Sequence, residues 1–139
     1  MTPVHINYIA VLVASVVGFM LGGLWYSNVL FGKTWITLMG FTDQKMEDMK
    51  KQGLAKNYIA MAIGKLLMAF VLAYAIAHGG ITTMLHGAMK GFWVWLGFVA
   101  PVMMGSVLWE GKPVKLYVLN VSYYLVSLVV MGAILGLWR

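Results

Sequence analysis

The chain has 139 residues, of which 62% are hydrophobic and only 10% are charged, and its mean hydropathy is +0.86. A soluble domain normally has about 25% charged residues, so this composition excludes an ordinary soluble protein. The chain has no cysteine and a formal net charge of +6, which excludes disulfides and thiol redox chemistry and leaves the placement of the positive charges to be explained.

Four apolar stretches are long enough to cross a bilayer, for which about 20 residues suffice. They cover residues 8–26, 58–78, 85–108 and 114–138. The first stretch has the position of a signal peptide, but it is too long and no Lys or Arg precedes it, so we expect a retained helix. The sequence predicts one transmembrane domain over 1–139: an all-α membrane protein, a four-transmembrane-helix bundle with a short amphipathic cytoplasmic helix between spans 1 and 2.

The segment SNVLFGKT, which follows the first span, differs from the phosphate-loop pattern G-x-x-x-x-G-K-[ST] only where Ser27 replaces the first glycine. A phosphate loop needs a glycine-rich turn between a strand and a helix. This segment is apolar and follows an apolar helix, and Trp25, Tyr26 and Trp35 flank it as an interfacial aromatic belt. We therefore predict no nucleotide site and place Lys33 among lipid headgroups.

The connection between the first two spans contains TDQKMEDMKKQG, which is rich in helix-forming residues. Thr42 or Asp43 can cap this helix, and Gly53 is expected near its end. Met46 and Met49 share one face, with charged side chains elsewhere. The pattern indicates either an amphipathic helix on the cytoplasmic membrane surface or a solvated linker helix without a binding role.

With four spans, the connections 27–57 and 110–113 lie on one side of the membrane. Seven lysines lie at or near that side: Lys33, Lys45, Lys50, Lys51, Lys56, Lys112 and Lys115. The other side has only Lys90 and Arg139. Because positive residues stay cytoplasmic, we expect a multi-pass protein of the bacterial inner membrane, in contact with the lipid bilayer, with both termini extracytoplasmic. No basic surface remains for nucleic acid.

Every span carries small residues at i+4 spacing, which allow close helix packing in lipid. These residues are Ala10, Ala14, Gly18 and Gly22 in the first span, Ala69, Ala73 and Ala77 in the second, Gly87 and Gly91 in the third, and Gly132 and Gly136 in the fourth. They are more than one bundle interior needs, so they favour a homo-oligomer. Pro101 predicts a kink in the third span, either as a functional hinge or as ordinary curvature.

Lys65, within the second span, is the most costly residue of the chain. A lysine at the centre of a span costs about 2.5–3.5 kcal/mol on insertion scales. It lies one turn before Ala69 on the small-residue face, which would direct it toward other helices, with Glu110 as its natural counter-charge. Alternatively, its side chain extends to the cytoplasmic headgroups.

The fourth span carries a polar stripe. Tyr117, Asn120, Tyr124 and Ser127 follow one another at offsets of three, four and three residues, which places them on one helical face. Such a stripe either lines a polar cavity or forms hydrogen bonds between helices. With Lys65 and Glu110, these residues make up the candidate binding site.

Metal and cofactor sites are not predicted. His78 and His86 flank one connection, Met84 lies between them, and His5 is on the same side. Haem would need histidine pairs within the spans, and the 12 methionines are ordinary packing residues of helices. Neither a Ser–His–Asp triad nor a carboxylate dyad is present, so an enzyme is not favoured.

The segments GGLWYSNVLFGKTW and LWEGKPVKLYVLNVSYYLVSLVVMGAILGLW resemble the bacterial domain of unknown function 1761 family, and the resemblance covers nearly the whole chain. The positions that carry it are Trp25, Tyr26, Ser27, Gly32, Lys33, Trp35, Glu110, Asn120, Tyr124 and Gly132. The resemblance implies an integral membrane protein and no particular activity.

We therefore expect a homo-oligomeric module that binds or conducts a small solute, ion or lipid. The alternative is a structural or accessory subunit that packs against a larger membrane complex. An integral membrane enzyme is the third possibility, since the chain has few ionisable side chains for acid–base chemistry.

Overall fold

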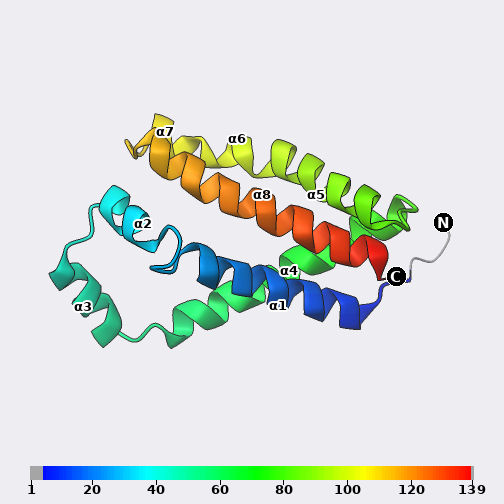
Figure 1. Cartoon of the computed structure of the whole chain (residues 1–139), viewed down its shortest axis with the longest axis horizontal. Coiled ribbons are helices and arrows are strands. Elements are labelled where there is room, and N and C mark those ends of the chain that lie inside the picture. The colour runs from blue at the N-terminus through cyan, green and yellow to red at the C-terminus, as the bar shows by residue number, and fades with distance from the viewer. Residues whose placement is uncertain (1–4, 139) are drawn as a thin grey trace.

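A computed structural model describes residues 5–138, which form helices and no strand (Figure 1). The helices are α1 (Tyr8–Trp25), α2 (Gly32–Met39), α3 (Asp43–Lys51), α4 (Ala55–His78), α5 (Met84–Phe98), α6 (Ala100–Met103), α7 (Gly105–Leu108) and α8 (Val114–Leu137). Four stretches are long and apolar enough to cross a membrane: α1, α4, α8 and the run from α5 to α7. The predicted all-α class and four span-like helices are confirmed, and they suggest a multi-pass membrane protein.

The connection between α1 and α4 differs from the prediction in having two helices. The predicted α3 is present, and the Thr42 hydroxyl accepts a hydrogen bond from Lys45 N at its start. The helix α2 was not predicted, because its sequence GKTWITLM mixes β-branched residues with an aromatic one and has no polar N-cap. The α2–α3 connection lies beside the C-terminal end of α1 and the N-terminal end of α4, away from the end of α8 (Figure 1).

The third span-like stretch is broken next to Pro101, where the sequence predicted a kink. Proline has no N–H and its ring clashes with the preceding turn, so α5 ends at Phe98 and α6 begins at Ala100. Met104 N donates to Pro101 O at 3.3 Å, and the Ala100 carbonyl instead accepts a hydrogen bond from the Tyr117 hydroxyl of α8 at 2.7 Å. A side chain of α8 therefore satisfies the carbonyl that the turn between α6 and α7 leaves free.

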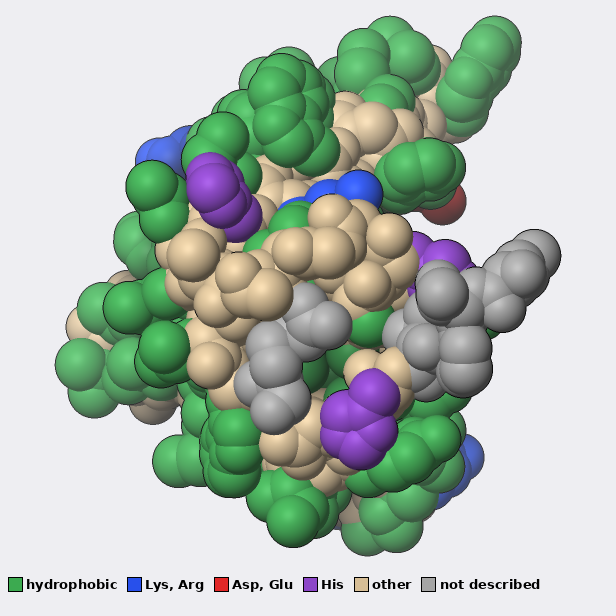
Figure 2. All heavy atoms as spheres, turned by 90° about the vertical axis from the view of Figure 1, so that its right-hand side faces the viewer, with side chains coloured by type: hydrophobic (Ala, Val, Ile, Leu, Met, Phe, Trp, Pro, Cys, Tyr) green, Lys and Arg blue, Asp and Glu red, His purple; other side chains and the backbone are tan. Residues whose placement is uncertain are grey.

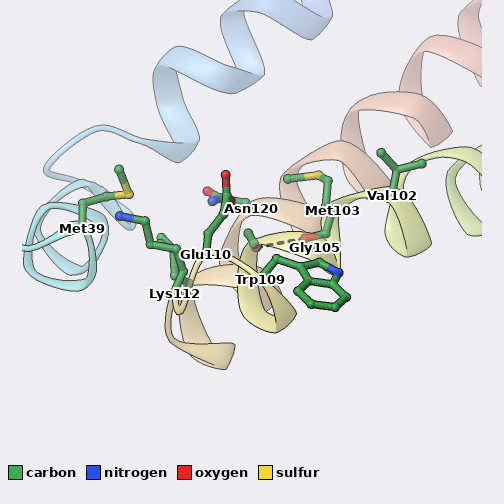
Figure 3. Close-up of a pocket in the computed structure, with 10 residues that line it drawn as sticks. Met39, Val102, Met103, Gly105, Trp109, Glu110, Lys112 and Asn120 are labelled. Carbon is green, nitrogen blue, oxygen red and sulfur yellow. Dashed lines mark hydrogen bonds between the residues drawn. The ribbon is translucent and has the colours of Figure 1, made fainter.

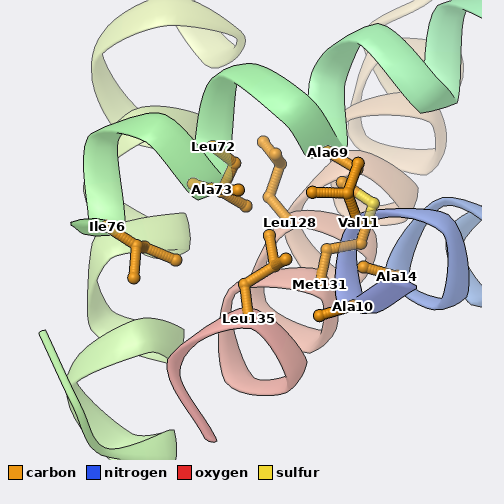
Figure 4. Close-up of a cluster of buried hydrophobic side chains, with 10 residues drawn as sticks. All are labelled: Ala10, Val11, Ala14, Ala69, Leu72, Ala73, Ile76, Leu128, Met131 and Leu135. Atoms are coloured by element: carbon orange, nitrogen blue, oxygen red, sulfur yellow. The ribbon is translucent and has the colours of Figure 1, made fainter. Parts of the chain in front are cut away.

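Helix α8 is the centre of the structure, since it packs against α1, α4 and α5, while α1 also packs against α4. The apolar core between α1, α4 and α8 consists of Ala10, Val11, Ala14, Ala69, Leu72, Ala73, Ile76, Leu128, Met131 and Leu135 (Figure 4). Small side chains of α1 and α4 thus meet larger ones of α8, which fills the space between the helices.

The predicted small-residue ladders are used inside the chain. A Cβ on Gly18 would lie 2.8 Å from Met131 Sδ of α8, and one on Gly22 would lie 2.8 Å from the Tyr123 hydroxyl. On the opposite side of α8, a Cβ on Gly91 would collide with the Leu128 carbonyl. These ladders therefore explain the packing of one protomer and give no support to an oligomer.

Candidate functional site

Lys65 points into the protein and is only 2% exposed. Its ammonium group donates a hydrogen bond to Ser127 Oγ of α8 at 3.2 Å. The same nitrogen lies 4.4 Å from the centroid of the Tyr123 ring and 4.8 Å from that of Tyr124, within the range of cation–π attraction. The side chain of Lys65 is therefore directed toward the other helices and does not extend to the lipid headgroups.

The expected pair of Lys65 with Glu110 is not formed, and this part of the prediction was wrong. Lys65 is the eleventh residue of α4, about 15 Å along the helix from its start, whereas Glu110 follows the end of α7 and is exposed. Among residues 5–138, the polar partner of Lys65 is a hydroxyl and its other neighbours are aromatic rings. The ammonium group therefore has no carboxylate partner there.

Three tyrosines gather where α1 ends against α8. The Tyr26 hydroxyl donates to Asn120 Oδ1 at 2.8 Å, and its ring meets that of Tyr123 edge to face at 5.5 Å. The Tyr123 hydroxyl donates to Gly18 O at 2.9 Å. Burial raises the pKa of Tyr26, and the nearby Tyr124 and Tyr123 raise it further, so Tyr26 is a neutral hydrogen-bond donor.

Sequence reasoning missed Tyr123, although a signal was present. It lies three residues after Asn120 and four before Ser127, so it fits the helical face of the polar stripe as well as Tyr124 does. The residues of the stripe serve both of its predicted roles, hydrogen bonding between helices and lining a cavity. Tyr117, Asn120 and Ser127 form hydrogen bonds between segments, whereas Asn120 and Tyr124 also line a cavity.

This cavity, here called the tyrosine cavity, has a volume of about 540 Å³. Its lining residues come from the C-terminal end of α1, from α2, α3, α4, α6 and α8, and from the residue before α4: Tyr26, Trp35, Ile36, Met46, Met49, Leu54, Asn57, Tyr58, Met61, Met103, Asn120, Tyr123 and Tyr124. Aromatic rings and methionines dominate, and two asparagines and the tyrosine hydroxyls are the polar groups. The apolar face of α3, with Met46 and Met49, therefore covers a cavity.

A second cavity of about 570 Å³, here called the glutamate cavity, lies between the end of α2, the helices α6 and α7, and the first turns of α8 (Figure 3). Glu110 and Lys112 line it together with Asn120, and Figure 3 shows these three side chains on the side of Met39. Asn120 lines both cavities. The structure thus places Glu110 near Asn120 and apart from Lys65.

Two aromatic residues at the end of α1 attach this end to α8 and α2. Trp25 Nε1 donates to Leu119 O at 3.2 Å. Tyr26 bonds to Asn120 and packs edge to face against Trp35 of α2 at 5.8 Å. These positions of the family resemblance therefore hold α2 in place over the tyrosine cavity.

The phosphate-loop-like segment forms a closed turn. The Ser27 hydroxyl donates to Leu24 O at 2.6 Å, and Gly32 N donates to Ser27 O at 2.8 Å. A Cβ on Gly32 would collide with the Tyr26 carbonyl, so only glycine fits this turn. The Gly32 amide is used by the turn, and Lys33 is exposed.

The histidines do not form a metal site with acidic residues. In the part of the chain that the structure describes, no group of three or more His, Cys, Asp or Glu side chains could hold a metal ion. The histidine side chains are spread over the end of the molecule seen in Figure 2. His78 packs on the Tyr74 ring, with centroids 4.2 Å apart.

Comparison with known proteins gives one match. The model of a family described as Protein of unknown function (DUF1761) matches residues 9–136. No curated protein and no solved structure matches the chain.

Proposed function

The chain belongs to the DUF1761 family of proteins of unknown function, and we propose that it is a membrane protein that binds a small, largely apolar molecule in the tyrosine cavity. The observation that carries this proposal is the cavity itself. Its volume of about 540 Å³ lies within the roughly 300–1,000 Å³ of small-molecule sites. Its apolar lining with a few polar groups is also typical of such sites.

The walls of the cavity support binding because they are built around it from separate segments. Tyr26 and Asn120 are held by their own hydrogen bond, and Trp35 packs edge to face on the Tyr26 ring. A preformed wall of this kind loses little conformational entropy on binding. The roof is different, since Met46 and Met49 are half-buried and lie on the short helix α3, where adaptable methionines can adjust to a ligand.

The proposed orientation places the tyrosine cavity at the cytoplasmic side of the inner membrane. Seven lysines lie in or near the α1–α4 and α7–α8 connections, at the end of the molecule that carries the cavity. Among the described residues the other end carries Lys90, and Arg139 lies outside the described residues. The positive-inside rule then gives extracytoplasmic termini.

A homo-oligomer is also proposed, through the outer face of the α5–α7 run. This run is the least buried of the four span-like stretches, and Trp93, Phe98 and Val102 are 60%, 76% and 73% exposed. Lipid alone, or a larger partner subunit, would cover the same face. Light scattering in several mild detergents separates these cases: a monomer contradicts the homo-oligomer, and a second protein that always co-purifies indicates an accessory subunit.

The binding proposal is tested with an uncharged probe, 4-phenylbutanamide, titrated against the protein in lipid nanodiscs with protein-free nanodiscs as the blank. Met49→Trp fills the cavity and should weaken binding at least about tenfold, the equivalent of 1.4 kcal/mol. Met20→Trp is the matched control, because Met20 is 65% exposed on α1 and lines neither cavity. Absence of binding to the wild type, or equal affinity of the three proteins, would contradict the proposal.

A further inference from the structure

We infer that the tyrosine cavity selects a monoanionic amphiphile, a carboxylate with an apolar body, because the unbalanced positive charge of Lys65 lies directly behind its wall. This inference rests on the proposed function and adds the charge of the ligand to it.

The charge of Lys65 is not balanced by the protein. The chain has four acidic residues: Asp43, Glu47 and Asp48 of α3, and Glu110 after α7. All four are exposed, and none pairs with Lys65, whose partners are Ser127 Oγ and two tyrosine rings. A buried ammonium group without a counter-ion is costly in a membrane protein, so an anion close to it would be favoured.

The charge lies one layer of side chains away from the cavity. Lys65 Nζ lies 4.4 Å from the centroid of the Tyr123 ring and 4.8 Å from that of the Tyr124 ring. Both tyrosines line the tyrosine cavity. Water cannot enter the space that the rings occupy, so it does not screen the attraction between charges on either side. Charges attract more strongly across such a low-dielectric layer than in solvent. A ligand anion in the cavity therefore interacts with Lys65 without direct contact.

The approach to the cavity carries the same sign of charge. Lys45 and Lys50 are neighbours in sequence of the roof residues Met46 and Met49, and Lys56 precedes the lining residue Asn57. This end of the molecule carries seven lysines and four acidic residues, so its net charge is positive. A positive surface of this kind concentrates anions and speeds their association.

The lining indicates which anion fits. Aromatic and methionine side chains accept an apolar body. The described residues include no arginine, since the only one is Arg139, and the planar guanidinium group is the one that binds phosphate through two parallel hydrogen bonds. A single lysine behind an apolar wall thus suits a monovalent carboxylate better than a phosphate ester.

The test compares three probes of the same shape: 4-phenylbutyrate, 4-phenylbutanamide and 4-phenylbutylamine, titrated at neutral pH against the protein in nanodiscs of uncharged lipid. The wild type should bind the carboxylate about tenfold more tightly than the amide and the amine least tightly. Lys65→Met should remove the preference for the carboxylate and leave the affinity for the amide unchanged. Lys65→Arg should retain the preference, and Lys90→Met, on α5, is the matched control.

A second measurement identifies the source of the preference without any variant. Salt screens exposed charges but affects buried ones far less, so 0.5 M NaCl should leave the carboxylate-to-amide ratio nearly unchanged. A ratio that falls to one assigns the preference to the surface lysines and overturns the inference. Equal binding of carboxylate and amide by the wild type, or a preference that persists in Lys65→Met, also overturns it while the cavity proposal stands. Failure of all three probes to bind the wild type overturns the proposed function itself.

Discussion

Lys65 and Ser127, which are 62 residues apart in the chain, are joined by a hydrogen bond of 3.2 Å between the second and fourth span-like helices. Both side chains are buried, and neither carries a negative charge. The Ser127 hydroxyl is therefore a neutral acceptor for a buried cation. It satisfies one N–H of the ammonium group but does not compensate for its charge.

This relationship gives a prediction for stability. Lys65→Met keeps most of the side-chain volume and removes the charge, so it should raise the thermal unfolding temperature in detergent. Ser127→Ala should lower the free energy of unfolding by about 1–3 kcal/mol, because it deprives the ammonium group of its acceptor. In the Lys65→Met background the same change should have a much smaller effect. Equal effects of Ser127→Ala in both backgrounds would contradict the coupling.

The crossing of α5 and α8 gives a second prediction. A Cβ at Gly91 would collide with the Leu128 carbonyl, whereas one at Gly97 of the same helix meets nothing within 4 Å. Gly91→Ala should destabilise the protein by about 1–3 kcal/mol, since the backbones must separate. Gly97→Ala should be neutral or stabilise it by up to about 1 kcal/mol through helix propensity. Thermal unfolding of the two variants side by side checks this difference.

The turn between α6 and α7 gives a third prediction. The Tyr117 hydroxyl donates to the carbonyl of Ala100, so Tyr117→Phe should cost about 0.5–1.5 kcal/mol of stability. Tyr8→Phe is the control, because Tyr8 is 69% exposed. Thermal unfolding of the two variants measures these costs. Equal losses in Tyr117→Phe and Tyr8→Phe would contradict a stabilising role for the bond to Ala100.

The proposed orientation is open to cysteine labelling, because the chain has no cysteine of its own. Gln52→Cys, after α3, should react with a membrane-impermeant maleimide only after the cells are permeabilised. Thr82→Cys, between α4 and α5, should react in intact cells. The reverse pattern would show that the termini face the cytoplasm.

Sequence reasoning was successful where the signal is local. The spans follow from apolar stretches, the start of α3 from Thr42, and the break of the third span from Pro101. The partner of Lys65 was not predictable in this way. It depends on how far α4 is displaced along α8, and residue spacing within one helix contains no information about that displacement. For the same reason, residue spacing within α8 could not show whether Tyr123 or Tyr124, or both, belongs to the polar face.

The helix α2 shows a different limit. Its own residues have weak helix preference, and it is held by packing against α8 and by the ring of Tyr26, which meets Trp35. Tertiary contacts of this kind override local propensity. Sequence reasoning interpreted the same aromatic residues as a belt at the membrane surface, a role that equally calls for Trp and Tyr.

The roof of the tyrosine cavity also carries sites for a protease. Helix α3 turns Met46 and Met49 toward the cavity and carries Lys45, Lys50 and Lys51, all exposed, which are sites for trypsin. Cleavage requires the local unfolding of this helix, and a molecule bound beneath the methionines must first leave or lose contact. The rate at which trypsin cleaves within α3 therefore reports whether the cavity is occupied, whatever the chemical identity of the ligand.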